Sequence, residues 1–190
     1  MTTVLDLFEE RRKSPDAMTQ HMDVIRKLAD DCDTCAEIGI RRASSTLALL
    51  ASSCEHVWSC DIEQLPQHDA IAKAAGKRWR RWYVPSESWE WPHIGVGLLC
   101  IDGYHTYSQV KAELDRFADQ VGRYLVFHDT LSCGIHGGGI ANRSLHESPH
   151  MSDTRGIRLA VDELMIRDPS WFIQAHYAND AGLLVLERRA

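Results

Sequence analysis

The sequence predicts an α/β fold in which a mostly parallel, seven-stranded sheet carries helices on both faces, and three observations lead to it. Short apolar runs of strand length alternate along the chain with segments whose apolar residues recur at helical spacing. Such alternation builds βαβ units, which produce a parallel sheet. A tight turn with Asn179 and Asp180 joins the last two apolar runs, so this pair is expected to form a C-terminal antiparallel hairpin.

The first half of the chain is expected to begin with an N-terminal helical segment over residues 1–31. Within it, the apolar residues of 16–31 follow helical spacing. Strands and helices then alternate. The expected strands are 35–40, 57–62 and 81–85, and the expected helices between them are 44–52 and 68–75. Small hydroxyl residues at the start of the first of these helices can cap it, and Gly76 ends the second.

The second half continues the alternation. The most apolar strand covers 97–101 and leads into an amphipathic helix over 107–120, which Gly122 is expected to end. The remaining strands are expected at 123–127, 171–177 and 182–187, with a helix over 155–167. Residues 130–154 form a long connection, and such connections are usually lids or disordered, so we predict a lid-like flap there. The whole pattern is Rossmann-like, and 190 residues suit a single domain.

Composition narrows the class of protein. The formal net charge is −6, from 27 acidic residues against 21 Lys and Arg, which argues against a surface built as a whole for nucleic acid or an anionic membrane. The apolar runs are of strand length, and Met1 to Lys13 lacks the long apolar stretch of a signal peptide, so we expect a cytoplasmic protein. The Cys32-x-x-Cys35 pair precedes a strand and has no second pair, so ordinary reduced thiols are expected.

Ligands of open α/β sheets bind beyond the carboxyl ends of the strands, which directs attention to the residues after each strand. After the first strand, Gly39 lets a ligand approach the backbone closely, and the free N–H groups of the following helix can bind a carboxylate. Asp61 ends the second strand, where a carboxylate can accept both hydroxyls of a ribose. Taken alone, each feature also fits a plain strand-to-helix turn.

Two further strand ends carry acid and imidazole groups. Asp102 can ligate a metal, and His105 titrates near neutral pH and can act as a general base. His128 and Asp129 end the neighbouring strand. If Asp102 and Asp129 lie side by side, they form a site for a hard divalent cation such as Mg²⁺, whereas His128 suits Mn²⁺ or a transition metal better. The structural alternative is that these groups only cap turns and hydrogen-bond the loop.

Together these segments resemble the class I S-adenosylmethionine-dependent methyltransferases. More narrowly, they resemble the group of cephalosporin-hydroxylase-like proteins and metal-dependent sugar O-methyltransferases. The resemblance rests on Glu37-Ile-Gly-Ile-Arg-Arg-Ala-Ser-Ser-Thr, on Ile-Asp102-Gly-Tyr-His105-Thr-Tyr107, and on Phe-His128-Asp129-Thr. It covers roughly residues 35–130, and the C-terminal hairpin agrees with it.

The resemblance implies a role for each matched position. The residues that would hold S-adenosylmethionine are Glu37 and Gly39 at the methionine end, Asp61 at the ribose, and Ser86 and Ser88 at the adenine. Ile40, Ile62 and Asp102 are also expected to bind the cofactor. Asp102, His128 and Asp129 would be the metal ligands, for Mg²⁺ or Mn²⁺. His105 would be the general base, with Asp102 as the second catalytic residue. The chain differs from the family near Ala43, where a second Gly is usual, and at His128, where an acid is frequent.

The implied chemistry is methyl transfer to a small-molecule acceptor, most directly to an oxygen. A cation that binds the acceptor oxygen lowers its pKa, a base takes the proton, and positioning supplies much of the rest. The motifs leave the acceptor, the metal and association into homo-oligomers open.

Two other classes of function compete with this interpretation. The stretch Lys77 to Tyr83 is basic and aromatic and could stack on single-stranded nucleic acid, but the acidic remainder of the chain favours a helix end that leads into a strand. A nucleic-acid partner is therefore disfavoured. A non-catalytic protein that binds S-adenosylmethionine or a nucleotide is the second alternative, since a cofactor site can persist without an acceptor site.

Overall fold

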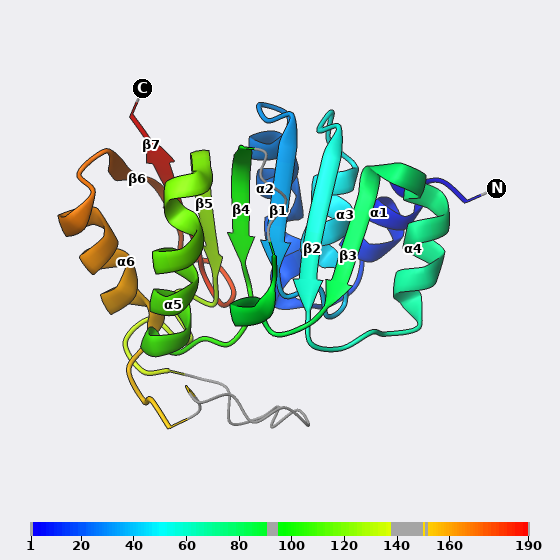
Figure 1. The fold of residues 1–190 in the computed structure, drawn as a ribbon. Helices are drawn as coiled ribbons and strands as arrows, with labels where there is room; N and C mark the ends of the chain where they lie inside the picture. The colour runs from blue at the N-terminus through cyan, green and yellow to red at the C-terminus, as the bar shows by residue number, and fades with distance from the viewer. Residues whose placement is uncertain (1, 91–94, 138–149, 151, 190) are drawn as a thin grey trace.

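A computed structural model describes residues 2–90, 95–137, 150 and 152–189 of the chain. Its centre is a seven-stranded sheet in the order β3-β2-β1-β4-β5-β7-β6 (Figure 1). The strands are β1 Thr34–Ile38, β2 His56–Asp61, β3 Trp79–Tyr83, β4 Val96–Ile101, β5 Val121–His128, β6 Trp171–Tyr177 and β7 Leu183–Arg188. β7 pairs antiparallel with β5 and β6, and β1 to β5 pair in parallel. The predicted mostly parallel sheet with a C-terminal antiparallel hairpin is confirmed.

Helices cover both faces of the sheet, as predicted. On one face lie α1 (Val4–Arg12), α2 (Met22–Ala29), α3 (Ser44–Leu50) and α4 (Gln67–Ala75), and on the other lie α5 (Tyr107–Phe117) and α6 (Ile157–Arg167) (Figure 1). The strands alternate between the two cores: Leu98 and Cys100 of β4 belong to one buried cluster, and Leu99 and Ile101 belong to the other. A parallel strand that is buried on both faces therefore reads as a continuous apolar run.

Several boundaries differ from the sequence expectation, and three of them are informative. The expected helix over 16–31 is split into a 3-10 turn, η1 (Ala17–His21), and α2, because the Asp16 side chain accepts from the Met18 N–H and starts a separate turn. β3 begins two residues earlier than expected, where Trp79 pairs with Val57. The prediction that Gly122 ends a helix is wrong, because α5 stops at Phe117 and Gly122 is extended within β5.

The remaining short elements are 3-10 turns that join helix to strand or strand to strand. They are η2 (Gly76–Arg78), η3 (Ser86–Ser88) and η4 (Ala118–Gln120). The six cysteines are free and buried. Among the helices that the structure describes, none is long and apolar enough to cross a membrane.

Candidate functional site

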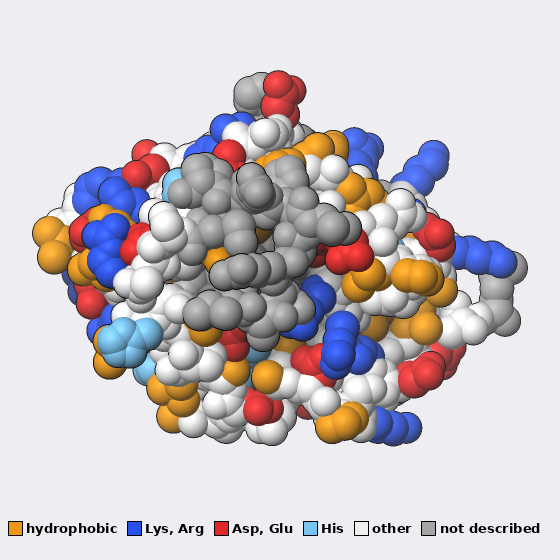
Figure 2. Space-filling view, turned by 90° about the horizontal axis from the view of Figure 1, so that it is seen from below, with side chains coloured by type: hydrophobic (Ala, Val, Ile, Leu, Met, Phe, Trp, Pro, Cys, Tyr) orange, Lys and Arg blue, Asp and Glu red, His pale blue; other side chains and the backbone are white. Residues whose placement is uncertain are grey.

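The predicted site residues gather at one edge of the sheet. Ile38 of β1 pairs with Ile101 of β4, and Ile101 pairs with Phe127 of β5, so the residues that follow these strands are neighbours. This edge is the lower one in Figure 1, toward which β1 to β5 point. Figure 2 looks onto it and shows acidic and basic side chains interspersed on this face. The topology therefore brings together the four segments that the sequence singled out.

The turn after β1 is held in an unusual backbone conformation. Gly39 has φ +93°, and its N–H donates to the carbonyl of Cys60 at 2.8 Å. Arg41 and Ala43 also have positive φ, of 38° and 60°. Ala43 therefore stands in a left-handed conformation that favours glycine. The turn presents the start of α3 toward the edge of the sheet.

Asp61 ties this turn to the end of β2. Its Oδ2 accepts from the N–H groups of Ile40 at 2.6 Å and Arg41 at 2.8 Å, and its Oδ1 accepts from Glu63 N–H at 3.0 Å. Ile62 beside it is an exposed apolar residue, with 44% of its surface accessible. The two elements predicted to bind the cofactor are thus in direct contact.

Glu37 lies inside the protein rather than at the surface of the site. Its Oε1 accepts from the hydroxyls of Thr46 and Ser59, each at 2.6 Å, and its Oε2 accepts from Ser45 at 2.8 Å. Burial raises the pKa of the Glu37 carboxyl to about 7, although these hydroxyls favour its ionised form. The indole N–H of Trp79 donates to Ser59 and extends the network. Glu37 therefore fixes the first turn of α3 against β1 and β2.

Ser86, which follows β3, also points into the protein. Its hydroxyl donates to Oε1 of Glu113 at 2.7 Å and accepts from Gln109 Nε2 at 3.0 Å. Burial raises the pKa of the Glu113 carboxyl to about 7. Oε2 of Glu113 is buried without a hydrogen-bond partner among the described residues. Sequence reasoning missed this network, because Glu113 sits on an otherwise ordinary amphipathic helix.

We expect Glu113→Gln to stabilise the protein above pH 7. Since the pKa of Glu113 is raised from 4.5 to about 7 on folding, its contribution to stability is fully present below pH 4.5 and is lost as the pH rises to about 7. A glutamine stays neutral, so the free energy of unfolding at pH 8 should rise by about 1–3 kcal/mol. Urea unfolding of the variant and the wild type at pH 5 and at pH 8 measures this change. An equal difference between variant and wild type at pH 5 and pH 8 would contradict it.

Asp102, His105, His128 and Asp129 form one hydrogen-bonded cluster. The Nε2 of His105 lies 3.2 Å from Oδ1 of Asp102, and its Nδ1 lies 3.2 Å from Oδ2 of Asp129. The Nδ1 of His128 lies 3.0 Å from the same Asp102 oxygen and 3.7 Å from Oδ1 of Asp129. His105 is therefore held between two carboxylates, one at each ring nitrogen.

These contacts set the charge of the cluster. Burial opposes ionisation of Asp102, but hydrogen bonds from His105 and His128 outweigh it and lower the pKa of Asp102 to about 2. Burial likewise disfavours an imidazolium at His105. Its hydrogen bonds with Asp102 and Cys133, and the charge of Asp129, nevertheless raise the pKa of His105 to about 10. At neutral pH the protein alone thus holds His105 as a cation between two anions.

The donor atoms fit a divalent cation. One ligand atom each from Asp102, His128 and Asp129 lie within 4.8 Å of one another. Two carboxylates with one imidazole suit Mn²⁺ or another first-row ion better than Mg²⁺, which prefers oxygen ligands alone. A second set of donors, His105, Asp129 and Cys133, meets the same limit. Sequence reasoning missed Cys133, although its place four residues after Asp129 puts both on one turn.

The basic and aromatic stretch Lys77 to Tyr83 packs and pairs with other parts of the protein. Trp79 is buried, and Arg78 donates to the carbonyls of Ser52 and Cys54. Arg81 pairs with Asp69 at 3.0 Å. This packing agrees with the structural interpretation rather than with a platform for nucleic-acid bases. The predicted flap falls largely on residues 138–149 and 151, which lie outside the described residues.

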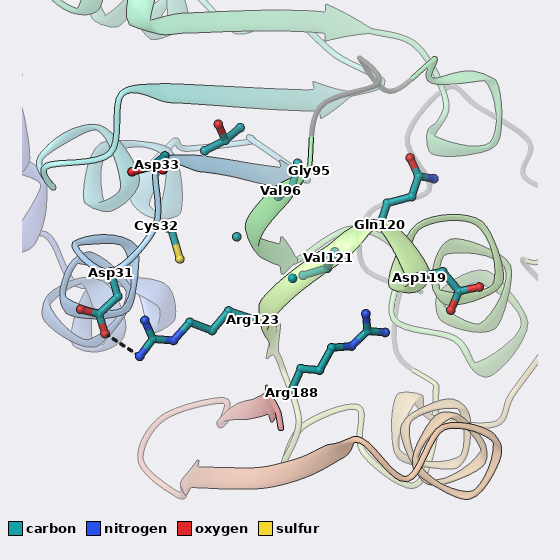
Figure 3. Close-up of a pocket in the computed structure, with 13 residues that line it drawn as sticks. Asp31, Cys32, Asp33, Gly95, Val96, Asp119, Gln120, Val121, Arg123 and Arg188 are labelled. Atoms are coloured by element: carbon teal, nitrogen blue, oxygen red, sulfur yellow. Dashed lines mark ion pairs between the residues drawn. The ribbon is translucent and has the colours of Figure 1, made fainter. Parts of the chain in front are cut away.

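A cavity of about 380 Å³ lies at the opposite edge of the sheet and contains none of the predicted site residues. It opens at the starts of β1, β4 and β5, and Arg123 and Arg188 project toward it (Figure 3). Arg123 pairs with Asp31 at 3.3 Å and Arg188 pairs with Asp168 at 3.0 Å. With their charges paired within the protein, these arginines do not form an anion site comparable to the cluster at the carboxyl edge.

Comparison with known proteins agrees with this architecture. No protein-family model and no curated protein sequence matches the chain. Among solved structures, a Staphylococcus aureus protein proposed to be a caffeoyl-CoA O-methyltransferase aligns with a TM-score of 0.65 at 15% identity, over 99% of this chain and 93% of that one.

Two further structures contain bound S-adenosylhomocysteine. The 1,6-didemethyltoxoflavin-N1-methyltransferase of Burkholderia thailandensis has a TM-score of 0.64 at 11% identity, covering 98% of this chain and 85% of that one. An O-methyltransferase from Bacillus cereus has a TM-score of 0.62 at 16% identity, covering 98% and 89%. At these identities the likeness is one of fold. The chain therefore has the Rossmann-like fold of the S-adenosylmethionine-dependent methyltransferases.

Proposed function

We propose that this protein is an S-adenosylmethionine-dependent methyltransferase that acts on an oxygen of a small-molecule acceptor. The observation that carries the proposal is the contact between two elements: the left-handed turn at Gly39, tied to Asp61, adjoins the Asp102–His105–His128–Asp129 cluster. The backbone of Asp102 joins them, since its N–H donates to Ile38 at 2.8 Å. A cofactor on the turn would thus place its methyl group beside the cluster.

The cofactor-binding part of the proposal follows the chemistry of each group. Asp61 offers a carboxylate to the ribose hydroxyls, and the exposed Ile62 offers an apolar surface to the adenine ring. Gly39 and Ile40 face the methionine end, while the buried Glu37 acts by holding the turn rather than by touching the ligand. Ser86 belongs to the segment proposed to lie at the adenine, although its hydroxyl is already engaged by Glu113.

The reaction breaks the bond between the sulfonium sulfur and its methyl group and forms a bond between that methyl group and the acceptor oxygen. The acceptor proton must pass to a base, and we assign this role to His105. His105 can accept it only when its pKa lies well below 10, which requires part of the negative charge of Asp102 and Asp129 to be neutralised. Asp102, His128 and Asp129 would hold a divalent cation, which would supply that charge and lower the pKa of an acceptor hydroxyl.

Calorimetric titration with S-adenosylhomocysteine tests the cofactor site. We expect wild-type protein to bind it, and Asp61→Ala to bind it about 10- to 100-fold more weakly, because a charge-assisted hydrogen bond contributes about 1.5–3 kcal/mol. Asp69→Ala is the matched control, since Asp69 is an exposed acid that pairs with Arg81 outside the site. The measurement is repeated with Mg²⁺ and with Mn²⁺. Absence of binding by the wild type in every condition would refute the proposal.

The non-catalytic alternative is separated from the enzyme by turnover. A protein that binds S-adenosylhomocysteine but transfers no labelled methyl group to any phenol, sugar or other hydroxyl compound, with either metal, would be a binding protein only. Transfer to any acceptor rules that alternative out. One observation supports this alternative: in the protein alone the raised pKa of His105 keeps its imidazole protonated at neutral pH, so that it cannot accept a proton.

A further inference from the structure

We propose that the turn after β5 carries a separate site for a thiophilic divalent cation such as Zn²⁺, with His105, Asp129 and Cys133 as its ligands. One ligand atom from each of the three lies within 4.8 Å of the others. The set shares only Asp129 with the Asp102–His128–Asp129 donors. It has the sulfur of Cys133 in place of the second carboxylate oxygen. Thiolate and imidazole together select Zn²⁺ over Mg²⁺ and Mn²⁺.

The orientation of His105 is the strongest geometric support. Its Nδ1 faces Oδ2 of Asp129 at 3.2 Å, close to the roughly 3.3 Å that separates two ligands of a tetrahedral zinc ion at bond lengths of about 2.0–2.1 Å. Its Nε2 faces Oδ1 of Asp102 at 3.2 Å. A zinc-bound imidazole usually donates its other N–H to a carboxylate in this way. Asp102 thus serves the site as the outer partner of His105.

The turn that carries the other two ligands is fixed by its own hydrogen bonds. Asp129 has φ +58°, and its carbonyl accepts from the Cys133 N–H at 2.8 Å, which closes the turn. The carbonyl of Cys133 accepts from the N–H of Ile157 at the start of α6, at 3.1 Å. The N–H of Leu131 donates to Ala181 beside β7, at 2.8 Å. Both ligands are therefore held from two sides before any ion binds, which reduces the entropic cost of binding.

Occupation of this site would have one consequence for catalysis, and only this consequence rests on the proposed function. Because the ion uses His105 and Asp129, it removes the proposed base and one ligand of the other cation site. Zn²⁺ is then an inhibitor, whereas Mn²⁺ or Mg²⁺ assists. The site itself stands on its ligand geometry and requires no cofactor.

Cobalt absorption tests the site directly. Co²⁺ is titrated into chelator-treated wild-type protein, and we expect a near-ultraviolet charge-transfer band from sulfur to cobalt, which Zn²⁺ then removes. Cys133→Ser should lose the band and bind Zn²⁺ about 10- to 100-fold more weakly by calorimetry, the loss typical of a removed partner at a metal site. The matched control is Cys32→Ser, another buried thiol, which should keep the band.

The outcomes separate this site from every other part of the protein. A wild type without the band, or a band that survives in Cys133→Ser and disappears in Cys32→Ser, would overturn the proposal. Asp129→Asn should weaken cobalt binding as well, and unchanged binding in that variant would also count against it. Titration of the same proteins with S-adenosylhomocysteine is an independent test. A cobalt band without cofactor binding would support the metal site and refute the methyltransferase proposal. Cofactor binding without a cobalt band would support the methyltransferase proposal and refute the metal site.

Discussion

Gly39→Ala is expected to lower the free energy of unfolding by about 2–5 kcal/mol and to abolish binding of S-adenosylhomocysteine. Gly39 has φ +93°, where an alanine is strained. A Cβ at this position would lie 2.6 Å from the carbonyl carbon of Asp102 and closer still to its oxygen. Neither atom can move freely, because both belong to the backbone that links β4 to the Asp102–His105–His128–Asp129 cluster. The turn would have to shift away from Asp61 and Asp102 together.

Gly122→Ala is the matched control for this substitution. Gly122 lies in β5, and an added Cβ would meet only the carbonyl oxygen of Val96, at an ordinary 3.7 Å. We expect its free energy of unfolding to change by less than about 1 kcal/mol. Urea unfolding compares the two variants, and calorimetry at a temperature where both are folded compares their binding. If Gly39→Ala binds S-adenosylhomocysteine as the wild type does, the turn is not the cofactor site.

The fold was largely predictable because local patterns and the sheet agree with one another. Apolar runs such as 97–101 are strand-sized and are buried on both faces, so periodicity and burial give the same answer. The error at Gly122 arose because one residue type suits two kinds of local structure. Gly122 is compatible with a helix end and with an extended strand, and the pairing of its neighbours Val121 and Tyr124 with β4 decides between them. Such choices are made by tertiary contacts, which a local pattern does not contain.

The candidate site was predictable to the level of which strand ends meet, but not of which atoms meet. The parallel topology places Asp102 beside His128 without further information. By contrast, the burial of Glu37 depends on the hydroxyl of Ser59 on another strand. The hydrogen bond of Ser86 depends likewise on the carboxyl of Glu113, which lies on a distant helix. Cys133 was missed for a related reason. Its relation to His105 is set by the turn that begins at Asp129 and by the start of α6, and the spacing from Asp129 alone does not show that His105 lies beside this turn.

Asp102→Asn is expected to lower the pKa of His105 from about 10 by two or more pH units. Asp102 is the hydrogen-bond partner at Nε2 and one of the two charges that stabilise the imidazolium, and each pH unit corresponds to about 1.4 kcal/mol. The titration of the His105 ring proton, followed by NMR on chelator-treated protein, measures the change. Its signal is assigned by its absence in His105→Gln. Asp129→Asn is the matched control, and should lower the pKa less because Asp102 remains.

The same groups determine how stability depends on pH. His105 has its pKa raised from 6.5, so its contribution is fully present below pH 6.5 and is lost as the pH rises toward 10. Asp102 has its pKa lowered from 3.8, so its contribution is present above pH 3.8 and is lost as the pH falls through 2. Wild-type stability from this pair is therefore greatest between about pH 4 and pH 6.5. Asp102→Asn should remove the acid slope and reduce the alkaline slope, because Asp129 and Cys133 still raise the pKa of His105. A wild-type His105 that titrates near 6.5 would contradict the charge assignment, and would mean that His105 can accept a proton without a cation on the two carboxylates.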